Sequence, residues 1–328
     1  MTSRDRPRHV PRLRFRPTTR RDFPECLELL PAWLALDSRL RAELPDLWLR
    51  LLDAPAIMTT VMEDLAQPAG QRIQGWGWGI ALPEAWAEQR GLTRNPAAHV
   101  VRQVCAGLLD GSLALMSDAE IGAVNADGRY HFLNFYAQRH NDLSDPYTQS
   151  VLTIANEAFR LSASGYNTQA MYFETSERDA PAIAAAGFHH RPYADDSSLQ
   201  GLAAAERPVF FVVTREQALA GLPGTSVRHV FEQHPPLFRF SASQRRLLWL
   251  ALFDDSDAHL TERLGVSVHG LKKLWRGIYE RIENQMPEFF GDGASDEDGK
   301  RGPEKRRQVL AYVRQRPEEL RPWVTASR

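Results

Sequence analysis

The stretch SASQRRLLWLALFDDSDAHLTERLGVSVHGLKKLWRGIYERI, from Ser241 to Ile282, carries the clearest local pattern in this chain of 328 residues. Its apolar residues recur at helical spacing, which predicts three successive helices over residues 244–253, 258–264 and 268–282. Gly265 ends the second helix, because glycine adopts a positive φ at little cost. Ser267 is a favourable N-cap for the third helix. The stretch therefore predicts a compact helix-turn-helix.

The third predicted helix has two faces. Leu271, Leu274 and Ile278 fall at i, i+3 and i+7, so we expect them to pack against the first two helices. Its exposed first turns are basic, and Arg and Lys side chains there can reach guanine acceptors or phosphates in the major groove of DNA. An ordinary packing unit with a solvated basic face is the alternative. The residues expected to contact DNA are Ser267, Val268, His269, Lys272, Lys273 and Arg276.

The segment HLTERLGVSVHGLKK, residues 259–273, resembles the core of the LuxR-type helix-turn-helix. The positions that follow the pattern of that family are Leu260, Leu264, Val266, Ser267, Leu271 and Lys272. His259, Thr261 and Gly270 replace its usual Glu, Ala and Thr, which leaves a sigma-factor-like or other helix-turn-helix open. The resemblance implies a transcription regulator that binds double-stranded DNA as a homodimer.

Length and composition predict a cytoplasmic protein of about two domains. The chain is 43% hydrophobic and 25% charged, values ordinary for a globular protein. Cys26 and Cys105 offer neither a disulfide framework nor metal-ligand spacing, which fits a reducing compartment. No apolar run approaches the ~18 residues that a membrane-spanning helix needs, so we expect no membrane partner.

The net charge is −1, so the chain as a whole is not expected to bind polyanions. Its N-terminus is nevertheless basic: residues 1–21 hold eight arginines and one acid, Asp5. No apolar segment follows that would make a secretory signal. We expect a basic disordered tail over 1–11, the alternative being an arm that adds nonspecific affinity for DNA.

The region 12–216 predicts an α+β fold, in which helices flank a mixed sheet. Its expected order is a strand, two helices, a hairpin, a helix, a strand, a long helix, a strand, a short helix and a last strand. The expected bounds are 13–19, 22–30, 38–52, 56–64 and 72–82, 97–109, 130–138, 146–163, 169–175, 180–186 and 209–214. The GWGWG run at 75–79 is expected inside a strand and not in a phosphate loop, because no helix follows it.

This order resembles the GNAT acyltransferase superfamily. RFRPTTRRDFPECLEL, residues 14–29, is similar to its opening strand and helix, and the Gly187-Phe188 pair to the one after its last short helix. That family holds the coenzyme A pyrophosphate on a glycine-containing loop before the long helix, and often protonates the leaving thiolate with a tyrosine. Here the loop 138–147 lacks glycine and carries Asp142 and Asp145, while Ile183 occupies the tyrosine position.

These departures favour a noncatalytic domain for sensing or dimerisation, with no catalytic residue and no cofactor. His140, His189 and His190 lack neighbours at metal-ligand spacing, so no metal site is expected. The remaining parts of the chain are predicted as a linker (217–237), the DNA-binding domain (238–290), a disordered acidic loop (291–302) and a C-terminal helix with its tail (303–328).

The sequence thus favours a DNA-binding transcription regulator, with an unknown small molecule as a candidate ligand of its N-terminal domain. One alternative is an active enzyme, an acyl-CoA-dependent N-acyltransferase fused to a DNA-binding domain. Another is a noncatalytic protein-interaction module that does not contact DNA. The loop at 138–147 discriminates the enzyme from the other two.

Overall fold

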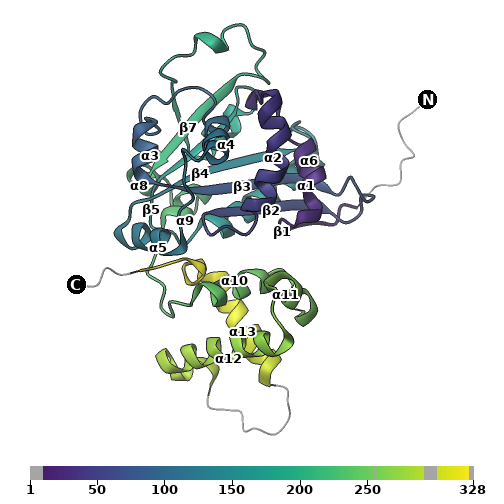
Figure 1. Ribbon diagram of the computed structural model, residues 1–328, viewed down its shortest axis with the longest axis vertical. Coiled ribbons are helices and arrows are strands. Elements are labelled where there is room, and N and C mark those ends of the chain that lie inside the picture. Colours follow the sequence, from purple (N-terminus) through teal and green to yellow (C-terminus); the bar gives the residue numbers. More distant parts are fainter. Residues whose placement is uncertain (1–9, 255, 292–300, 325–328) are drawn as a thin grey trace. The chain divides into compact units, whose positions relative to one another are not determined.

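The computed structural model describes residues 10–254, 256–291 and 301–324, and the chain divides into two compact units (Figure 1). Unit 1 consists of residues 1–117, 130–162 and 168–229. Unit 2 consists of residues 118–129, 163–167 and 230–328. The region predicted as one continuous domain, 12–216, therefore contributes two short segments to the second unit.

Unit 1 is built on a mixed sheet of seven strands in the order β1-β2-β3-β4-β5-β7-β6. The strands are β1 (Leu13–Pro17), β2 (Ile57–Asp64), β3 (Ile73–Leu82), β4 (Tyr130–Gln138), β5 (Thr168–Ser176), β6 (His189–Arg191) and β7 (Pro208–Thr214). Only β4 and β5 pair in parallel, and the other neighbours are antiparallel. The mixed sheet predicted from the order of elements is confirmed.

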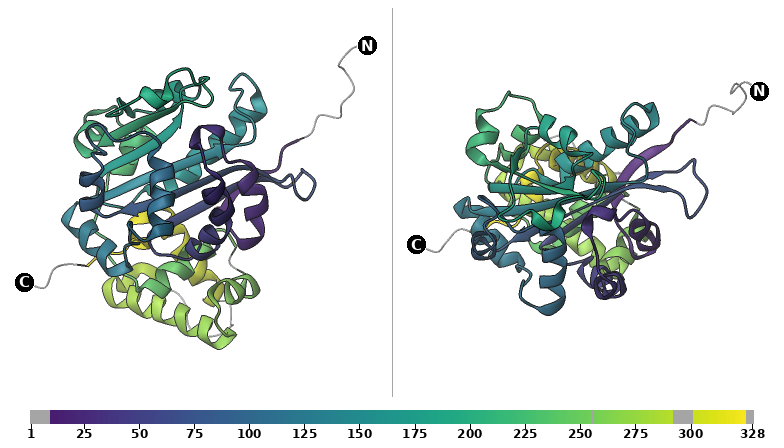
Figure 2. Two further views of the ribbon diagram at one scale, coloured as in Figure 1. Left: turned by 45° about the horizontal axis from the view of Figure 1, so that its top comes forward. Right: turned by 90° about the horizontal axis from the view of Figure 1, so that it is seen from above.

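Helices cover both faces of this sheet (Figure 2). The helices of unit 1 are α1 (Phe23–Glu28), α2 (Ser38–Leu51), α3 (Glu84–Gln89), α4 (Val100–Asp110), α6 (Pro146–Ala163), α7 (Ala180–Ala185) and α8 (Arg215–Ala220). The next helix, α9 (Ser226–Phe231), begins in unit 1 and ends in unit 2. Buried residues of α1, α2 and α4 share one hydrophobic cluster with the sheet, whereas α6 packs in a second cluster with Met62. The unit is therefore a sheet between two helical layers.

Aromatic rings fill the larger of these clusters. Trp76 and Trp78 of β3 lie on one face of their strand, with ring centroids 5.4 and 4.6 Å from that of Trp48 on α2. Gly79 leaves space on the other face, since a Cβ there would lie 1.9 Å from the Phe132 ring. The GWGWG run thus forms part of a strand, as predicted, and serves ring packing.

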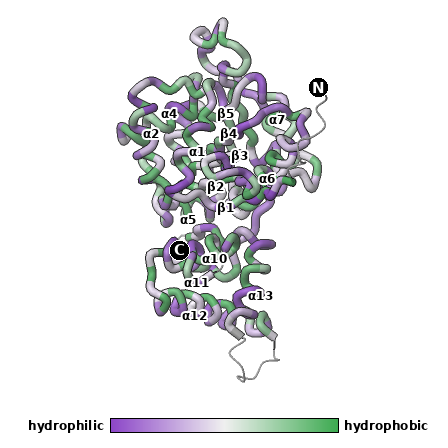
Figure 3. The backbone as a smooth tube through the Cα atoms, turned by 90° about the vertical axis from the view of Figure 1, so that its right-hand side faces the viewer, coloured by the Kyte–Doolittle hydropathy of each residue, from purple (hydrophilic) through white to green (hydrophobic). Residues whose placement is uncertain are grey.

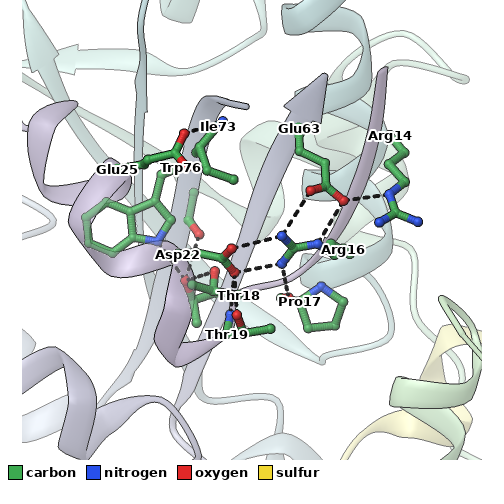
Figure 4. Close-up of polar contacts among 12 residues, drawn as sticks. Arg14, Arg16, Pro17, Thr18, Thr19, Asp22, Glu25, Glu63, Ile73 and Trp76 are labelled. Carbon is green, nitrogen blue, oxygen red and sulfur yellow. Dashed lines mark hydrogen bonds and ion pairs between the residues drawn. The ribbon is translucent and has the colours of Figure 1, made fainter. Parts of the chain in front are cut away.

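A buried ionic network joins β1, β2 and the start of α1 (Figure 4). The Arg16 guanidinium donates to both oxygens of Asp22 at 2.7 and 2.9 Å and to both oxygens of Glu63 at 2.8 and 3.0 Å. Burial alone would raise the pKa of each carboxyl, but the hydrogen bonds and charge of Arg16 outweigh it and lower both. Arg16 therefore keeps two buried carboxylates ionised.

Unit 2 is all-helical among its described residues. Its helices are α5 (Asp118–Asp127), α10 (Ala242–Ala251), α11 (Asp257–Leu264), α12 (Val268–Gln285) and α13 (Arg301–Gln315). The three helices predicted over 244–282 are confirmed: α10 and α11 begin earlier than predicted, and α12 begins at the predicted residue and extends further, to Gln285. Ser241 and Gln244 form a capping box that begins α10 earlier, and Ser256 accepts from His259 N to begin α11.

Two further expectations need comment. The predicted linker at 217–237 holds most of α8 and all of α9. Thr214 and Gln217 form a capping box that starts α8 directly after β7. Most of the predicted acidic loop, 292–300, and of the predicted basic tail, 1–9, lies outside the described residues. The C-terminal helix already begins at Arg301, and Val309 and Val313 on its apolar side are fully buried.

The described residues contain no helix with the length and apolar character needed to cross a membrane. Nor do three His, Cys, Asp or Glu side chains gather anywhere in that part of the chain so as to hold a metal ion.

Candidate functional site

The turn between α11 and α12 has the local chemistry that the sequence predicted. Gly265 follows α11 with a φ of 65°, in the left-handed region. Ser267 is the N-cap of α12, and its hydroxyl oxygen accepts from Gly270 N at 3.1 Å. The side-chain cap of Ser267 therefore fixes the first turn of α12, and the tight turn at Gly265 sets the direction of α12 relative to α11.

One row of α12 is buried among the helices of unit 2. Leu271, Ile278 and Ile282 have no exposed surface, and Trp275 is 3% exposed. Leu274, predicted as a core residue, is only half-buried. The prediction was wrong at that position because Trp275, at i+4 from Leu271, continues the row to Ile278 and Ile282 over a longer helix. Hydrophobic and hydrophilic residues alternate along the tube of α12 (Figure 3).

All the residues predicted to contact DNA are exposed. Lys272 and Arg276 are one turn apart, as are His269 and Lys273, so they form two adjacent rows. Lys272, Lys273 and Arg276 form no ion pair with any residue that the structure describes. The start of α12 therefore presents a group of positive charges that the surrounding fold leaves unneutralised.

Other cations of the unit serve packing. Arg306 of α13 lies 4.8 Å from the ring centroid of Trp275 and donates to Asp257 at 3.0 Å. Arg314 donates to the carbonyl oxygen of Leu252 at 2.8 Å. Their contacts hold α13 against α11, α12 and the end of α10, so the basic surface at the start of α12 belongs to a packed unit.

A second candidate site lies in unit 1, where β4 and β5 separate. Their paired register ends at Asn134 and Phe173, although the strands continue to Gln138 and Ser176. A cavity of about 660 Å³ opens there. Crevices at the carboxyl ends of parallel strands are common ligand sites. Its lining includes Trp33, Tyr136, Arg139, Leu152, Phe173 and Ile183.

Sequence reasoning singled out only Asp142 and Ile183 among the residues that line this cleft. The others come from the end of α1 and the segment after it, from both strands, from the loop before α6, from α6 and α7, and from Ala205. No local motif connects them. Their single shared signal was the parallel order of β4 and β5 with a long helix between them. The cleft is therefore a product of tertiary structure.

The N-terminus of α6 is capped by Asp145, a carboxylate of the preceding loop. Asp145 accepts from Tyr147 N and Thr148 N, both at 3.2 Å, and from the Thr148 hydroxyl at 3.0 Å. These hydrogen bonds lower the pKa of Asp145, that from Tyr147 N most. A helix N-terminus with free N–H groups binds phosphate well. Here the chain supplies the anion itself.

Comparisons with known proteins give likeness of fold only. No protein-family model matches the sequence, and no curated protein does. A chimera of SpeG spermidine N-acetyltransferase from Vibrio cholerae and hSSAT is 14% identical, with a TM-score of 0.35, over 62% of this chain and 96% of the chimera. FeeM, an N-acyl amino acid synthase from uncultured soil microbes, is 10% identical, with a TM-score of 0.33, over 65% and 98%. These values assign no activity.

We expect the full-length chain to transfer no acetyl group from acetyl-coenzyme A to amines. Asp145 fills the helix N-terminus that a pyrophosphate would need, and Ile183 cannot protonate a thiolate. A ligand at 100 times its Kd stabilises the folded state by about 2.7 kcal/mol, so thermal unfolding with acetyl-coenzyme A is a sensitive measurement. No shift is expected. Turnover by purified protein that disappears when residues 138–147 are altered would contradict this.

Proposed function

We propose that the chain is a DNA-binding transcription regulator of the LuxR-like helix-turn-helix type. The observation that carries the proposal is the exposed basic surface of Lys272, Lys273 and Arg276 at the start of α12, which forms no ion pair with the described residues. The same helix buries a separate row that includes Leu271 and Trp275. In helix-turn-helix proteins the N-terminal residues of the second helix enter the major groove. α11 and α12 would be the two helices of such a motif.

The members of this surface are expected to act differently. Lys272, Lys273 and Arg276 carry positive charge on flexible side chains, which suits phosphate contacts that give affinity without sequence preference. His269 is nearest the start of the helix and can hydrogen-bond a base edge. A homodimer on a two-fold site, with half-sites about one helical turn apart, would double the number of contacts.

Unit 1 is proposed as a noncatalytic acyltransferase-like domain that senses a ligand. The support is the self-capped start of α6 together with an open cleft between β4 and β5. An active N-acetyltransferase fused to the DNA-binding unit remains the alternative, and the acetyl-transfer experiment above tests it. A protein-interaction module would differ from both in retarding no DNA.

The proposal is tested with Lys272→Ala and Lys273→Ala. Each lost phosphate contact should reduce the slope of log Kobs against log salt by about 0.9, on selected and random DNA alike. Affinity should fall on both kinds of DNA, while thermal unfolding stays like that of the parent. His269→Ala should instead relax preference at one base position. The measurements are fluorescence anisotropy at several salt concentrations and selection of bound sequences from random DNA.

The matched control is Arg307→Ala, which also removes one positive charge from unit 2. Arg307 is 78% exposed on α13 and pairs with Glu304 in its own helix. We expect this variant to keep the salt slope of the parent. If both lysine variants fold normally and bind as tightly as the parent, α12 is not the recognition helix.

A further inference from the structure

Two short segments of unit 2 interrupt the sequence of unit 1. They are residues 118–129, which contain α5, and residues 163–167. The first leads directly into β4, which begins at Tyr130, and the second directly into β5, which begins at Thr168. The two inserts therefore precede the two strands whose carboxyl ends separate to form the cleft of unit 1.

The first insert is bonded to α10. Asp118, at the start of α5, accepts from the Arg245 guanidinium at 2.5 and 2.6 Å, one hydrogen bond for each carboxylate oxygen. Arg245 also donates to the carbonyl oxygen of Phe240, just before α10. Both hydrogen bonds to Asp118 come from Nη2 of Arg245, and hydrogen bonds between ionised partners are stronger than neutral ones. α5 therefore helps to set the position of α10, the helix that precedes the two helices of the proposed DNA-binding motif.

Asn125 joins both inserts to the C-terminal segment. Its side chain is fully buried; its amide nitrogen donates to Pro322 O at 2.8 Å, and its oxygen accepts from Asn167 N. Val324 N donates to Gly122 O at 3.1 Å. Because these groups are removed from water, displacing one of them leaves unsatisfied polar atoms. The inserts and the C-terminal segment should therefore move as one body.

Arg321 binds the second insert, residues 163–167. Arg321 Nε donates to Ser164 O at 2.8 Å, and its guanidinium lies 4.7 Å from the ring centroid of Tyr166 and 5.9 Å from that of Trp249 on α10. Gly165 has a φ of 85°, and a Cβ there would lie 2.4 Å from Glu318 N. The insert thus fits closely in unit 2 and reaches α10 through one side chain.

Both inserts therefore act on α10, and α10 packs against α11 and α12. In unit 1, the amino-terminal parts of β4 and β5 are paired from Tyr130 to Asn134, while their carboxyl ends are apart. A ligand that changes the distance between the carboxyl ends of β4 and β5 would move these two strands, and each strand directly follows one of the inserts in the sequence. Packed elements transmit such shifts because they are not freely deformable.

We propose that the cleft between β4 and β5 is an effector site whose occupancy changes the affinity of α12 for DNA, with α5 and residues 163–167 carrying the coupling. The inference rests on the proposed function and adds its regulation. The lining favours a small amphipathic molecule without phosphate. Its floor includes Trp33, Leu152 and Phe173, and Asp145 already occupies the anion position at the start of α6.

The test replaces the ligand by a side chain that fills the cleft. Ala182→Trp on α7 and Ala205→Trp each place an indole in the lining without altering the buried core of unit 1. Coupling free energies between sites usually correspond to 5–150-fold changes in affinity. We therefore expect the Kd for selected DNA to change at least ~5-fold. The salt slope should stay the same, because the phosphate contacts are unchanged.

The matched control is Ala184→Trp, which is exposed on the same short helix and does not line the cleft. It should bind DNA like the parent. Asp118→Asn should reduce the effect of Ala182→Trp by half or more, whereas Asp127→Asn, an exposed position of α5, should not. A double-mutant cycle measures this coupling.

The outcomes separate the two proposals. If the parent binds DNA and both cleft-filling variants fold and bind with the Kd of the parent, the effector site is wrong and the proposed function stands. The same holds if Ala184→Trp has an equal effect, or if Asp118→Asn leaves the effect unchanged. Failure of the parent to bind any DNA overturns the proposed function itself. Thermal unfolding shows which variants fold, and either cleft-filling variant suffices for the decision.

Discussion

Arg16→Met is expected to lower the free energy of unfolding of unit 1 by about 3–5 kcal/mol, because removing one partner of a buried ionic group leaves charges uncompensated. Asp22 is 7% exposed and Glu63 is 4% exposed. Methionine keeps much of the side-chain volume, so the loss reports on charge more than on packing. Urea unfolding followed by tryptophan fluorescence suits the measurement, because unit 1 buries Trp33, Trp48, Trp76 and Trp78.

The difference between parent and variant should depend on pH. In the parent, the pKa values of Asp22 and Glu63 are lowered in the folded state. Their contribution is therefore present above the unfolded pKa values, about 4, and is lost as the pH falls through the folded values. Without Arg16, burial opposes ionisation of both carboxyls more strongly, although Thr19 still donates to Asp22 and Arg14 still pairs with Glu63. Protonation then costs the variant less than it costs the parent. The gap between the two proteins should therefore narrow from pH 7 to pH 3.

Arg39→Met is the control for this experiment. Arg39 pairs with Glu43 on the surface of α2, where both side chains are largely exposed. Exposed pairs of this kind contribute little to stability, so this variant should unfold like the parent. Adding Asp22→Asn and Glu63→Gln to Arg16→Met should recover part of the loss, because the uncompensated charges disappear. If Arg16→Met costs less than about 1 kcal/mol at pH 7, the network does not hold these elements together.

Local chemistry was predictable from the sequence and distant contacts were not. Gly265 and Ser267 act within their own turn, so their backbone φ and cap could be read from neighbouring residues. Trp275 required a choice between two helical rows, and Leu274 is equally apolar. The capping box of Thr214 and Gln217 was a visible signal for α8, although the prolines and glycines around it favoured a linker.

Which segments of the chain make up unit 2 could not be predicted from the sequence. Asn125 lies near the end of α5, a helix that the sequence did not predict, and nothing near it in the sequence indicates that its partner is Pro322, 197 positions away. The cleft of unit 1 could not be predicted either, since Trp33 and Phe173 both line it only after the sheet has formed. In contrast, Asp145 and Ile183 could be singled out from the sequence, because each is recognised by its position in or beside a single helix, α6 for Asp145 and α7 for Ile183.

Leu271→Ala is expected to abolish DNA binding at 37 °C by unfolding part of unit 2. Leu271 has no exposed surface and lies in the first turn of α12, directly before Lys272. Truncating a buried leucine costs about 2–5 kcal/mol, because it removes apolar contacts and leaves a cavity. Unit 2 has a small core around α10, α11 and α12, so its unfolding transition should move to a clearly lower temperature. Calorimetry or hydrogen exchange of α12 would show this.

Temperature distinguishes this loss from that in the lysine variants. Leu271→Ala reduces the folded fraction and leaves the basic surface intact, so cooling to 10 °C should restore much of its affinity and the salt slope of the parent. Lys272→Ala and Lys273→Ala lack phosphate contacts at every temperature, so cooling should not restore their slope. Leu274→Ala, at a half-buried neighbouring position, should fall between Leu271→Ala and the parent in stability. If Leu271→Ala melts like the parent yet fails to bind DNA, Leu271 contacts the DNA directly and the inward face of α12 has been assigned wrongly.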